Sequence, residues 1–267
     1  MSDLEISDRG AVRVLTINRP ERRNALSATT ADELCAAVQD AGRTAEVGAL
    51  VLRGAGGHFS SGGDAHAILG VIDDDEDAAP IRLMQSFHRL VQAIWDCELP
   101  VVAAVSGVVY GGAFNLALSC DLIYASHDAR FCQVFIERGV APDVGGAYLL
   151  PRVVGLHKAK ELMMLAGEID ARQAADLGLV NGILPDADAV HAHALEVAAQ
   201  LAAKPRFAVS LTKRLLNSST TGTLQSSLEL EAITQATILR SPSARAGFRD
   251  FLDRGRRTPG TATPQTD

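Results

Sequence analysis

Three short stretches hold the residues whose types and spacing could do chemistry, and two of them are rich in glycine. SSGGD at 60–64 and YGGAF at 110–114 each follow an apolar run that is typical of a buried strand. Glycine lets the backbone approach a ligand closely, because no Cβ intervenes, and a helix that begins there adds its dipole. Two such amides that converge on one carbonyl oxygen form an oxyanion hole, in which each donor is worth about 100- to 1000-fold in rate. Taken singly, each glycine pair is more simply explained as a tight turn.

The third stretch, RGVAPDVGG at 138–146, carries one carboxylate, Asp143, among apolar residues. Apolar surroundings raise the pKa of a carboxyl group toward neutrality, as a base for carbon acids requires. An aspartate placed shortly before a helix is also a common N-cap. Asp143 is therefore a candidate for proton transfer, and capping of a helix that begins near Gly145 is the alternative.

An alternation of strands, glycine loops and helices must position these stretches. The predicted strands are 4–7 and 11–18, which form a hairpin, and 48–54, 99–107, 121–126, 129–133 and 179–185. The predicted helices are 24–45, with Ser27 as its N-cap, 80–96, 113–120, 157–166 and most of the chain from 188 onward. This order indicates an α/β fold that ends in an all-helical segment over about 204–255.

Composition limits the class of protein. The chain has 267 residues, of which 47% are hydrophobic, so it can bury an ample core. The net charge of −7 and the lack of a basic block interleaved with aromatic residues argue against nucleic acid as a partner. Four cysteines without a CxxC pair, an acidic start and no apolar run near the roughly 18 residues of a membrane span predict a soluble cytoplasmic protein. His191 and His193 face apart on a helix, so no metal site is expected.

Several longer stretches resemble the crotonase superfamily, the enoyl-CoA hydratases and isomerases. The four that carry the resemblance, in order, are HFSSGGDA at 58–65, LPVVAAVSGVVYGGAFNLALSCDLIYAS at 99–126, ARFCQVFIERGVAPDVGGAYLLPRVVG at 129–155 and ARQAADLGLVNGILP at 171–185. NRPERRNALS near the start and GFRDFLDRGRR near the end fit the same family. The resemblance implies a spiral of repeated ββα units over 1–200, a C-terminal helical trimerisation region over 201–257 and a disordered tail over 258–267. It also implies a homotrimer or a dimer of trimers.

The resemblance further implies an acyl-CoA thioester as substrate, with no separate cofactor because coenzyme A belongs to the substrate. The thioester carbonyl would lie between the amides of Gly63 and Gly112, where both matching residues are glycine. Other residues that the resemblance places in contact with the substrate are Ala25, Asp64, Ala65, Asn115, Phe135 and Arg254.

The chain departs from the family hydratases at the two positions that matter for adding water. Those enzymes hold the water between two glutamates, and the matching positions here are Asn115 and Phe135. An amide cannot take a proton at a useful pH, so hydration by the usual route is not expected. Family isomerases and 4-chlorobenzoyl-CoA dehalogenases have an aspartate at the turn that matches Asp143. We therefore favour double-bond isomerisation of an enoyl-CoA through a stabilised enolate.

Three alternatives stay open at the level of sequence. The first is a hydratase with an unusual acid/base set that includes Glu137, which strand alternation would place on the same face as Phe135. The second is an aryl-CoA dehalogenase-like enzyme, and the third is a protein that binds acyl-CoA without turning it over. His88 is expected to be structural or pocket-lining. Asn115→Asp, which restores a carboxylate, is predicted to preserve acyl-CoA binding and to allow traces of hydration.

Overall fold

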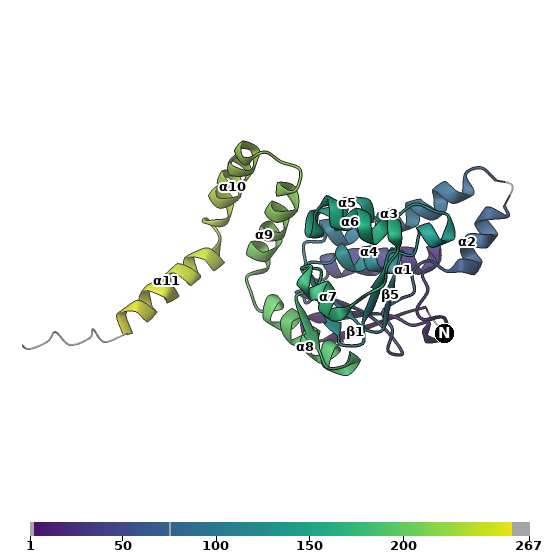
Figure 1. The fold of residues 1–267 in the computed structure, drawn as a ribbon. Coiled ribbons are helices and arrows are strands. Elements are labelled where there is room, and N and C mark those ends of the chain that lie inside the picture. Colours follow the sequence, from purple (N-terminus) through teal and green to yellow (C-terminus); the bar gives the residue numbers. More distant parts are fainter. Residues whose placement is uncertain (1–2, 75, 258–267) are drawn as a thin grey trace, which may run out of the picture. The chain divides into compact units, whose positions relative to one another are not determined.

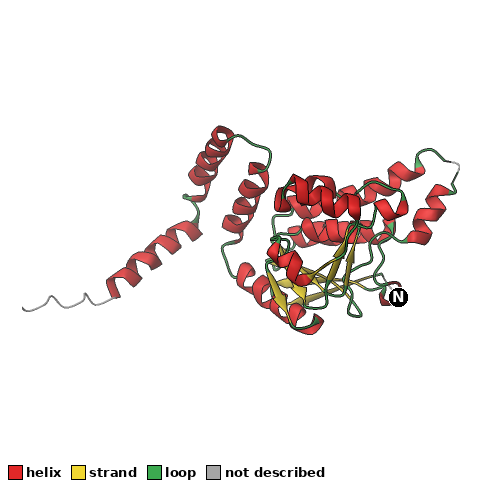
Figure 2. Cartoon of the chain, viewed as in Figure 1, coloured by secondary structure: helices red, strands yellow, loops and turns green. Residues whose placement is uncertain are grey.

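The computed structural model describes residues 3–74 and 76–257, with side chains up to Arg254. The chain divides into two compact units, and the division falls between Arg214 and Leu215. The predicted disordered tail, 258–267, lies outside the described residues. Figure 1 labels the elements in chain order, and Figure 2 shows the strands gathered among the helices of the first unit. In the described part of the chain, we find no helix with both the length and the apolar character that a bilayer crossing requires.

Two sheets form the centre of the first unit. The larger has the strand order β1-β2-β3-β4-β6-β9, with only the β1–β2 hairpin antiparallel, and the smaller has the order β5-β7-β8. The strands of the larger sheet are β1 (Leu4–Arg9), β2 (Val12–Ile17), β3 (Ala49–Gly54), β4 (Val101–Val105), β6 (Leu122–Ser126) and β9 (Gly182–Leu184). Those of the smaller are β5 (Val108–Tyr110), β7 (Arg130–Cys132) and β8 (Ile169–Asp170). The prediction of an α/β fold is confirmed, although β5 and β8 are too short to stand out in the sequence.

Helices cover both faces of the larger sheet, because its parallel strands are apolar on both sides. Leu50 and Leu52 of β3 pack toward α1 and α3, whereas Ala49 and Val51 pack against α8. The helices of the first unit are α1 (Ala28–Arg43), α2 (Ala65–Ile72), α3 (Ala79–Asp96), α4 (Gly112–Leu118), α5 (Gly146–Val154), α6 (Leu156–Leu165), α7 (Ala171–Asp176) and α8 (Ala187–Ala202). The last three, α9 (Arg206–Ser219), α10 (Leu224–Ile238) and α11 (Pro242–Arg257), confirm the predicted helical end. Ser27 caps α1 as expected, accepting a hydrogen bond from the Thr30 amide at 3.1 Å.

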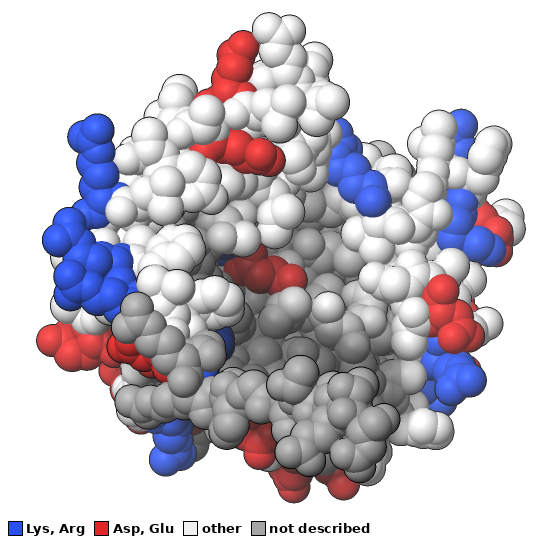
Figure 3. Space-filling view, turned by 90° about the vertical axis from the view of Figure 1, so that its left-hand side faces the viewer, with Lys and Arg blue, Asp and Glu red and all other residues white. Residues whose placement is uncertain are grey.

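Charged side chains are dispersed on the one face that Figure 3 shows. On the face drawn in Figure 3, the Lys and Arg side chains and the Asp and Glu side chains form small separate groups among uncharged residues. The described residues of that face therefore present no extended basic surface of the kind that nucleic-acid-binding proteins use.

An ion pair with a buried ammonium group attaches the part of α9 that belongs to the first unit to the rest of that unit. Lys213 is 8% exposed, and its Nζ lies 2.8 Å from a carboxylate oxygen of Asp121. The same ammonium donates to the carbonyl oxygens of Ile94 at 2.9 Å and Leu99 at 3.2 Å. Burial raises the pKa of Asp121, and the charge of Lys213 opposes that rise. One ammonium group thus serves three acceptors, of which the Asp121 carboxylate also accepts a hydrogen bond from the Val101 amide at 2.7 Å.

We expect Lys213→Met to lower the free energy of unfolding by about 1–3 kcal/mol, because it removes the cation beside Asp121 and the donor to two backbone carbonyl oxygens. Urea unfolding followed by circular dichroism measures the change. Lys158→Met, which removes an exposed partner of Glu161, serves as control and should cost less than about 1 kcal/mol. Equal stability of the two variants would contradict this account of α9.

Candidate active site

The two glycine stretches lie side by side in the folded chain. The Ser60 amide donates to the carbonyl oxygen of Val108 at 3.0 Å, and the Tyr110 amide donates to that of Ser60 at 3.1 Å. The first stretch thus runs parallel to β5, which leads directly into the second. At Gly62, a Cβ would lie 2.7 Å from the carbonyl oxygen of Tyr110 and 3.4 Å from the amide nitrogen of Gly112. Only glycine allows this approach.

The amides of Gly63 and Gly112 are available to a ligand. Neither donates a hydrogen bond to another residue that the structure describes. Gly112 is the first residue of α4, and Gly111 before it has a positive φ of 53°, which reverses the chain at the end of β5. The free amide at the start of α4 can therefore meet a carbonyl oxygen. The arrangement permits the oxyanion hole predicted from the sequence, and that role stays a prediction.

Asp143 lies beside Gly112, and one of its carboxylate oxygens accepts no hydrogen bond from a described residue. A Cβ on Gly112 would lie 3.5 Å from Asp143 Oδ1. This oxygen is buried and has no hydrogen-bond partner among the described residues. Burial raises the pKa of Asp143 to about 6, against an opposing hydrogen bond from its own backbone amide. A carboxyl group with this pKa is ionised in a useful fraction near neutral pH and can accept a proton.

The alternative role of Asp143 as a helix cap is wrong. Helix α5 begins at Gly146, and its N-cap is Gly145, which has a φ of 75°. No side chain caps the helix. Val144, with a φ of 49°, and Gly145 both have a left-handed conformation. They turn the chain between Asp143 and the helix, so the carboxylate does not reach the helix amides.

Asn115 holds the turn that carries Asp143. Its side chain is fully buried, and its Nδ2 donates to the carbonyl oxygen of Asp143 at 2.8 Å. Its Oδ1 accepts a hydrogen bond from Nε2 of Gln133 at 2.8 Å. Gln133 thereby orients the amide of Asn115, which in turn positions the Asp143 backbone. The sequence did not single out Gln133, and its only signal was a polar residue at the end of a short apolar strand.

Because Asn115 is buried, Asn115→Asp should also affect the stability of the fold, which the sequence did not lead us to expect. An ionised aspartate there would face the carbonyl oxygen of Asp143 without a proton to donate, at the full cost of burial. We expect the variant to lose about 1–3 kcal/mol of unfolding free energy at pH 8. Its carboxyl pKa should be raised, so the loss should shrink at pH 5, where a protonated group can donate to that carbonyl. Urea unfolding at the two pH values measures this, and wild-type stability at both would contradict it.

Phe135 and Glu137 differ in their relation to the site. Phe135 is buried, and its ring comes within 3.7 Å of the position that a Cβ on Gly111 would occupy. Glu137 is exposed on a short 3₁₀ helix, Ile136–Arg138. The prediction that strand alternation places both on one face is wrong, because β7 ends at Cys132 and the chain then turns. Phe135 is thus a wall near the second glycine stretch, whereas Glu137 lies on the surface.

The first glycine stretch also contacts the segment that contains Ala25. The Leu26 amide donates to the carbonyl oxygen of Gly62, and the Asp64 amide donates to that of Leu26, each at 2.8 Å. Ala25 is buried next to this pairing, and Ala65 begins α2. Both residues therefore lie close to Gly63, and their predicted contact with the substrate stays a prediction.

The Asp64 side chain is committed to the protein itself. It caps α2 through the amides of His66 and Ala67, and Arg19 donates to it at 2.8 Å. Burial raises the pKa of Asp64, but the bonds from Arg19 and from the two amides outweigh it, so the pKa is lowered. Arg22 lies 3.4 Å from the same oxygen. Only the backbone of Asp64 is left for a ligand.

Two further candidates belong to other helices. Arg254 is on α11 in the C-terminal unit, where it pairs with Asp250. Its predicted contact with the substrate stays a prediction. His88 is exposed on α3, so a structural role in the core is excluded for it.

Comparison with known proteins gives a consistent match. Residues 7–258 match the family described as enoyl-CoA hydratase/isomerase. The chain is 38% identical to a probable enoyl-CoA hydratase of Rhodobacter capsulatus, over 94% of each chain. It is 33% identical to the 1,2-epoxyphenylacetyl-CoA isomerase of Escherichia coli, over 90% of this chain and 92% of the relative. An enoyl-CoA hydratase from Polaromonas sp. JS666 superposes with a TM-score of 0.90 at 31% identity, covering 96% of this chain and 98% of that one.

Proposed function

Because the chain belongs to the enoyl-CoA hydratase/isomerase family, whose members act on acyl-CoA thioesters, we propose that it moves a double bond within an enoyl-CoA. The observation that carries the proposal is Asp143, whose carboxylate oxygen is buried, unsatisfied and adjacent to Gly112. At the positions that match the two hydratase glutamates, the chain has Asn115 and Phe135. A single proton carrier suits the transfer of one proton between two carbons better than the addition of water.

The proposed reaction has two proton transfers. The Asp143 carboxylate removes a proton from Cα of a 3-enoyl-CoA, and the electron pair delocalises onto the thioester carbonyl oxygen, which gives a dienolate conjugated with the C3–C4 double bond. The amides of Gly63 and Gly112 donate hydrogen bonds to that oxygen, where charge develops. The carboxyl group then returns the proton to Cγ, the double bond moves into conjugation with the carbonyl, and Asp143 is ionised again.

Similarity to named relatives supports an isomerase and also gives the second candidate. The relative from Escherichia coli is named as an isomerase of a CoA thioester, whereas the one from Rhodobacter capsulatus is named as a probable hydratase. Hydration by this chain would have to use Asp143 alone, since Asn115 is committed to two hydrogen bonds and Glu137 is exposed. We therefore place hydration second. Dehalogenase-like attack and binding without turnover have no support beyond the missing glutamates.

A direct assay separates the candidates. The purified chain is incubated with trans-3-hexenoyl-CoA and, separately, with trans-2-hexenoyl-CoA, and the products are identified by mass and by the absorbance of the conjugated thioester. We expect the 3-enoyl substrate to become conjugated and the 2-enoyl substrate to gain little water. Rapid formation of 3-hydroxyhexanoyl-CoA from the 2-enoyl substrate, without isomerisation of the 3-enoyl one, would assign the hydratase. No turnover of either substrate above background, with CoA thioester binding retained, would leave only the binding role.

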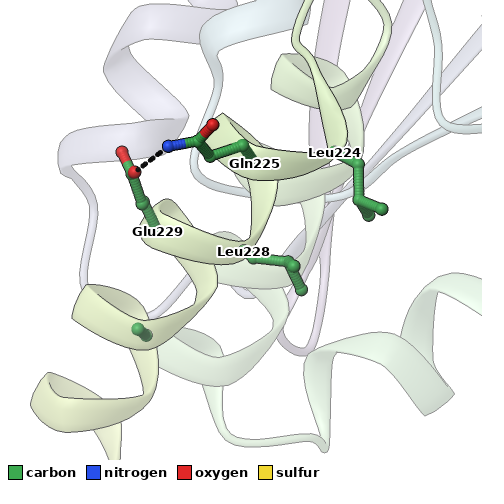
Figure 4. Close-up of a pocket in the computed structure, with 5 residues that line it drawn as sticks. Leu224, Gln225, Leu228 and Glu229 are labelled. Atoms are coloured by element: carbon green, nitrogen blue, oxygen red, sulfur yellow. Dashed lines mark hydrogen bonds between the residues drawn. The ribbon is translucent and has the colours of Figure 1, made fainter.

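We further propose that the chain assembles as a homotrimer or a dimer of trimers through its C-terminal unit. On α10, Leu224 is 77% exposed and Leu228 is 54% exposed, and with Ala232 they line a hollow. Figure 4 shows the two leucines pointing to the right, and Gln225 and Glu229, which line the same hollow and are hydrogen-bonded to each other, on the left. Other large apolar side chains that are exposed in this unit are Leu216, Ile233, Leu239, Phe248, Phe251 and Leu252. Apolar exposure on this scale is typical of a protein–protein interface.

We expect the double variant Leu224→Glu/Leu228→Glu to lower the mass of the particle, because two charges would have to be buried at the interface. Light scattering at micromolar concentration measures the mass. Ile6→Glu, at a residue that is 52% exposed on β1, is the matched control and should keep the wild-type mass. A wild-type chain that is monomeric at this concentration would reject the assembly.

A further inference from the structure

A cavity lies at the carboxyl ends of β3 and β4, on the face of the larger sheet that α8 covers. Its volume is about 220 Å³. Val51 of β3 and Ala104 of β4 pack against α8. Arg53 comes two residues after Val51, so strand alternation places its side chain on the same face of the sheet. The full lining is Arg53, Gly54, Gly56, Gly57, Ala104, Ser106, Ala187, Asp188 and His191. None of the candidate active-site residues is among them.

Arg53 enters this cavity without a carboxylate partner. Among the described residues, its side chain makes one hydrogen bond, a long one of 3.4 Å to the carbonyl oxygen of Gly54. Burial lowers the pKa of Arg53, and the charges of Asp188 and Glu5 oppose that effect. A guanidinium group presents five donors in a planar fork, and nearly all of them are unused here.

His191 of α8 contributes a second unsatisfied group to the lining. It lies on the second turn of α8, and its Nδ1 is buried with no hydrogen-bond partner in the described part of the chain. Burial lowers the pKa of His191, Arg53 and Arg9 lower it further, and Asp188 opposes them. Asp188 is exposed, so the one carboxylate of the lining is in contact with solvent. The N-terminal end of the α8 dipole adds to the positive electrostatic potential in the cavity.

We propose that this cavity is a binding site for a phosphate group. Arg53 would clamp two oxygens of the anion, and His191 would donate to a third from Nδ1. Donors that approach from β3 and from α8 suit a tetrahedral oxyanion, and the volume accommodates one with its bridging waters. The site lies on the opposite side of the sheet from α1 and α3, so the proposal does not depend on the reaction that the enzyme catalyses.

Titration of the full chain with inorganic phosphate, at constant ionic strength set with chloride, tests the site. In the wild type, we expect a saturable change in the imidazole resonances of His191 and a rise in its pKa, since a bound anion stabilises the imidazolium against Arg53 and Arg9. Arg53→Gln should weaken the affinity at least tenfold. Arg172→Gln, which removes an exposed arginine on α7, should leave the affinity unchanged. Enoyl-CoA turnover should be the same in all three proteins, which separates this test from that of the proposed function.

Two results would overturn the proposal. One is the absence of a saturable response of His191 in the wild type, a measurement that requires no variant to fold. The other is equal phosphate affinity in Arg53→Gln and Arg172→Gln, which would mean general screening of charge. A parallel titration with glycerol 3-phosphate identifies the source of the group. Binding of both ligands supports a phosphate ester, and binding of inorganic phosphate alone supports the free ion.

Discussion

Asp143→Asn is expected to lower the rate of double-bond isomerisation by about 100- to 10,000-fold, the range typical of a lost general base. The amide is nearly isosteric with the carboxylate, so binding of the CoA thioester should change little. The loss should therefore fall on kcat rather than on KM. In the wild type, kcat should decline below a pH of about 6, because the base must be ionised and its pKa is raised to about 6.

A true capping aspartate provides the control for this variant. Asp186 is the N-cap of α8 and accepts a hydrogen bond from the Ala189 amide at 2.8 Å. Asp186→Asn keeps an acceptor at that position and should leave kcat as it is. If Asp143→Asn retains the isomerase activity of the wild type, Asp143 is not the proton carrier.

The stability of the wild type and of Asp143→Asn should also diverge with pH, in a direction opposite to that of activity. The folded-state pKa of Asp143 is raised from 3.8 to about 6, so the buried carboxyl group favours the folded state only while it is protonated. The wild type should lose stability as the pH rises from about 4 through 6, whereas the amide of the variant does not titrate. The melting temperature of Asp143→Asn should therefore exceed that of the wild type at pH 7.5, and the two should converge near pH 4. A variant that is less stable at pH 7.5 would contradict the unsatisfied burial of this carboxylate.

The sequence was sufficient for the fold because its local and long-range signals agree. Apolar runs such as 48–54 and 121–126 are buried on both sides, so their composition alone identifies them as inner strands of a parallel sheet. The resemblance supplied the order of the units, and the prediction of a crotonase-type fold is confirmed by the similarity to solved structures. The two glycine stretches were also found, since only glycine can occupy positions where one backbone approaches another this closely.

The rest of the site depends on side-chain direction, which residue types do not reveal. Asn115 was expected to contact the substrate, and that contact stays a prediction. Its residue type did not reveal that its amide bonds to Gln133 and to the carbonyl oxygen of Asp143. Glu137 was expected to share a face with Phe135 because strand alternation was continued to residue 137. The strand, β7, ends five residues earlier, at Cys132. A strand of three residues gives too short a pattern for its end to be predicted. The error over Glu137 arises where the chain leaves regular structure, as the chain does again at the turn that carries the candidate base.

Gly112→Pro is expected to lower kcat by about 100- to 1000-fold, because it removes one of the two amide donors proposed for the enolate oxygen. Gly112 is the first residue of α4, the helical position at which proline is best tolerated, so the helix itself should persist. Gly112→Ala is the matched control, since it adds the same Cβ but keeps the N–H. That Cβ would lie 3.0 Å from Cγ2 of Val144, so both variants share any small displacement of the Asp143 turn. The ratio of the two kcat values, measured with proteins of equal melting temperature, isolates the donor. If the proline and alanine variants turn over at the same rate, the thioester oxygen does not bind at this amide, and the enolate must be stabilised elsewhere.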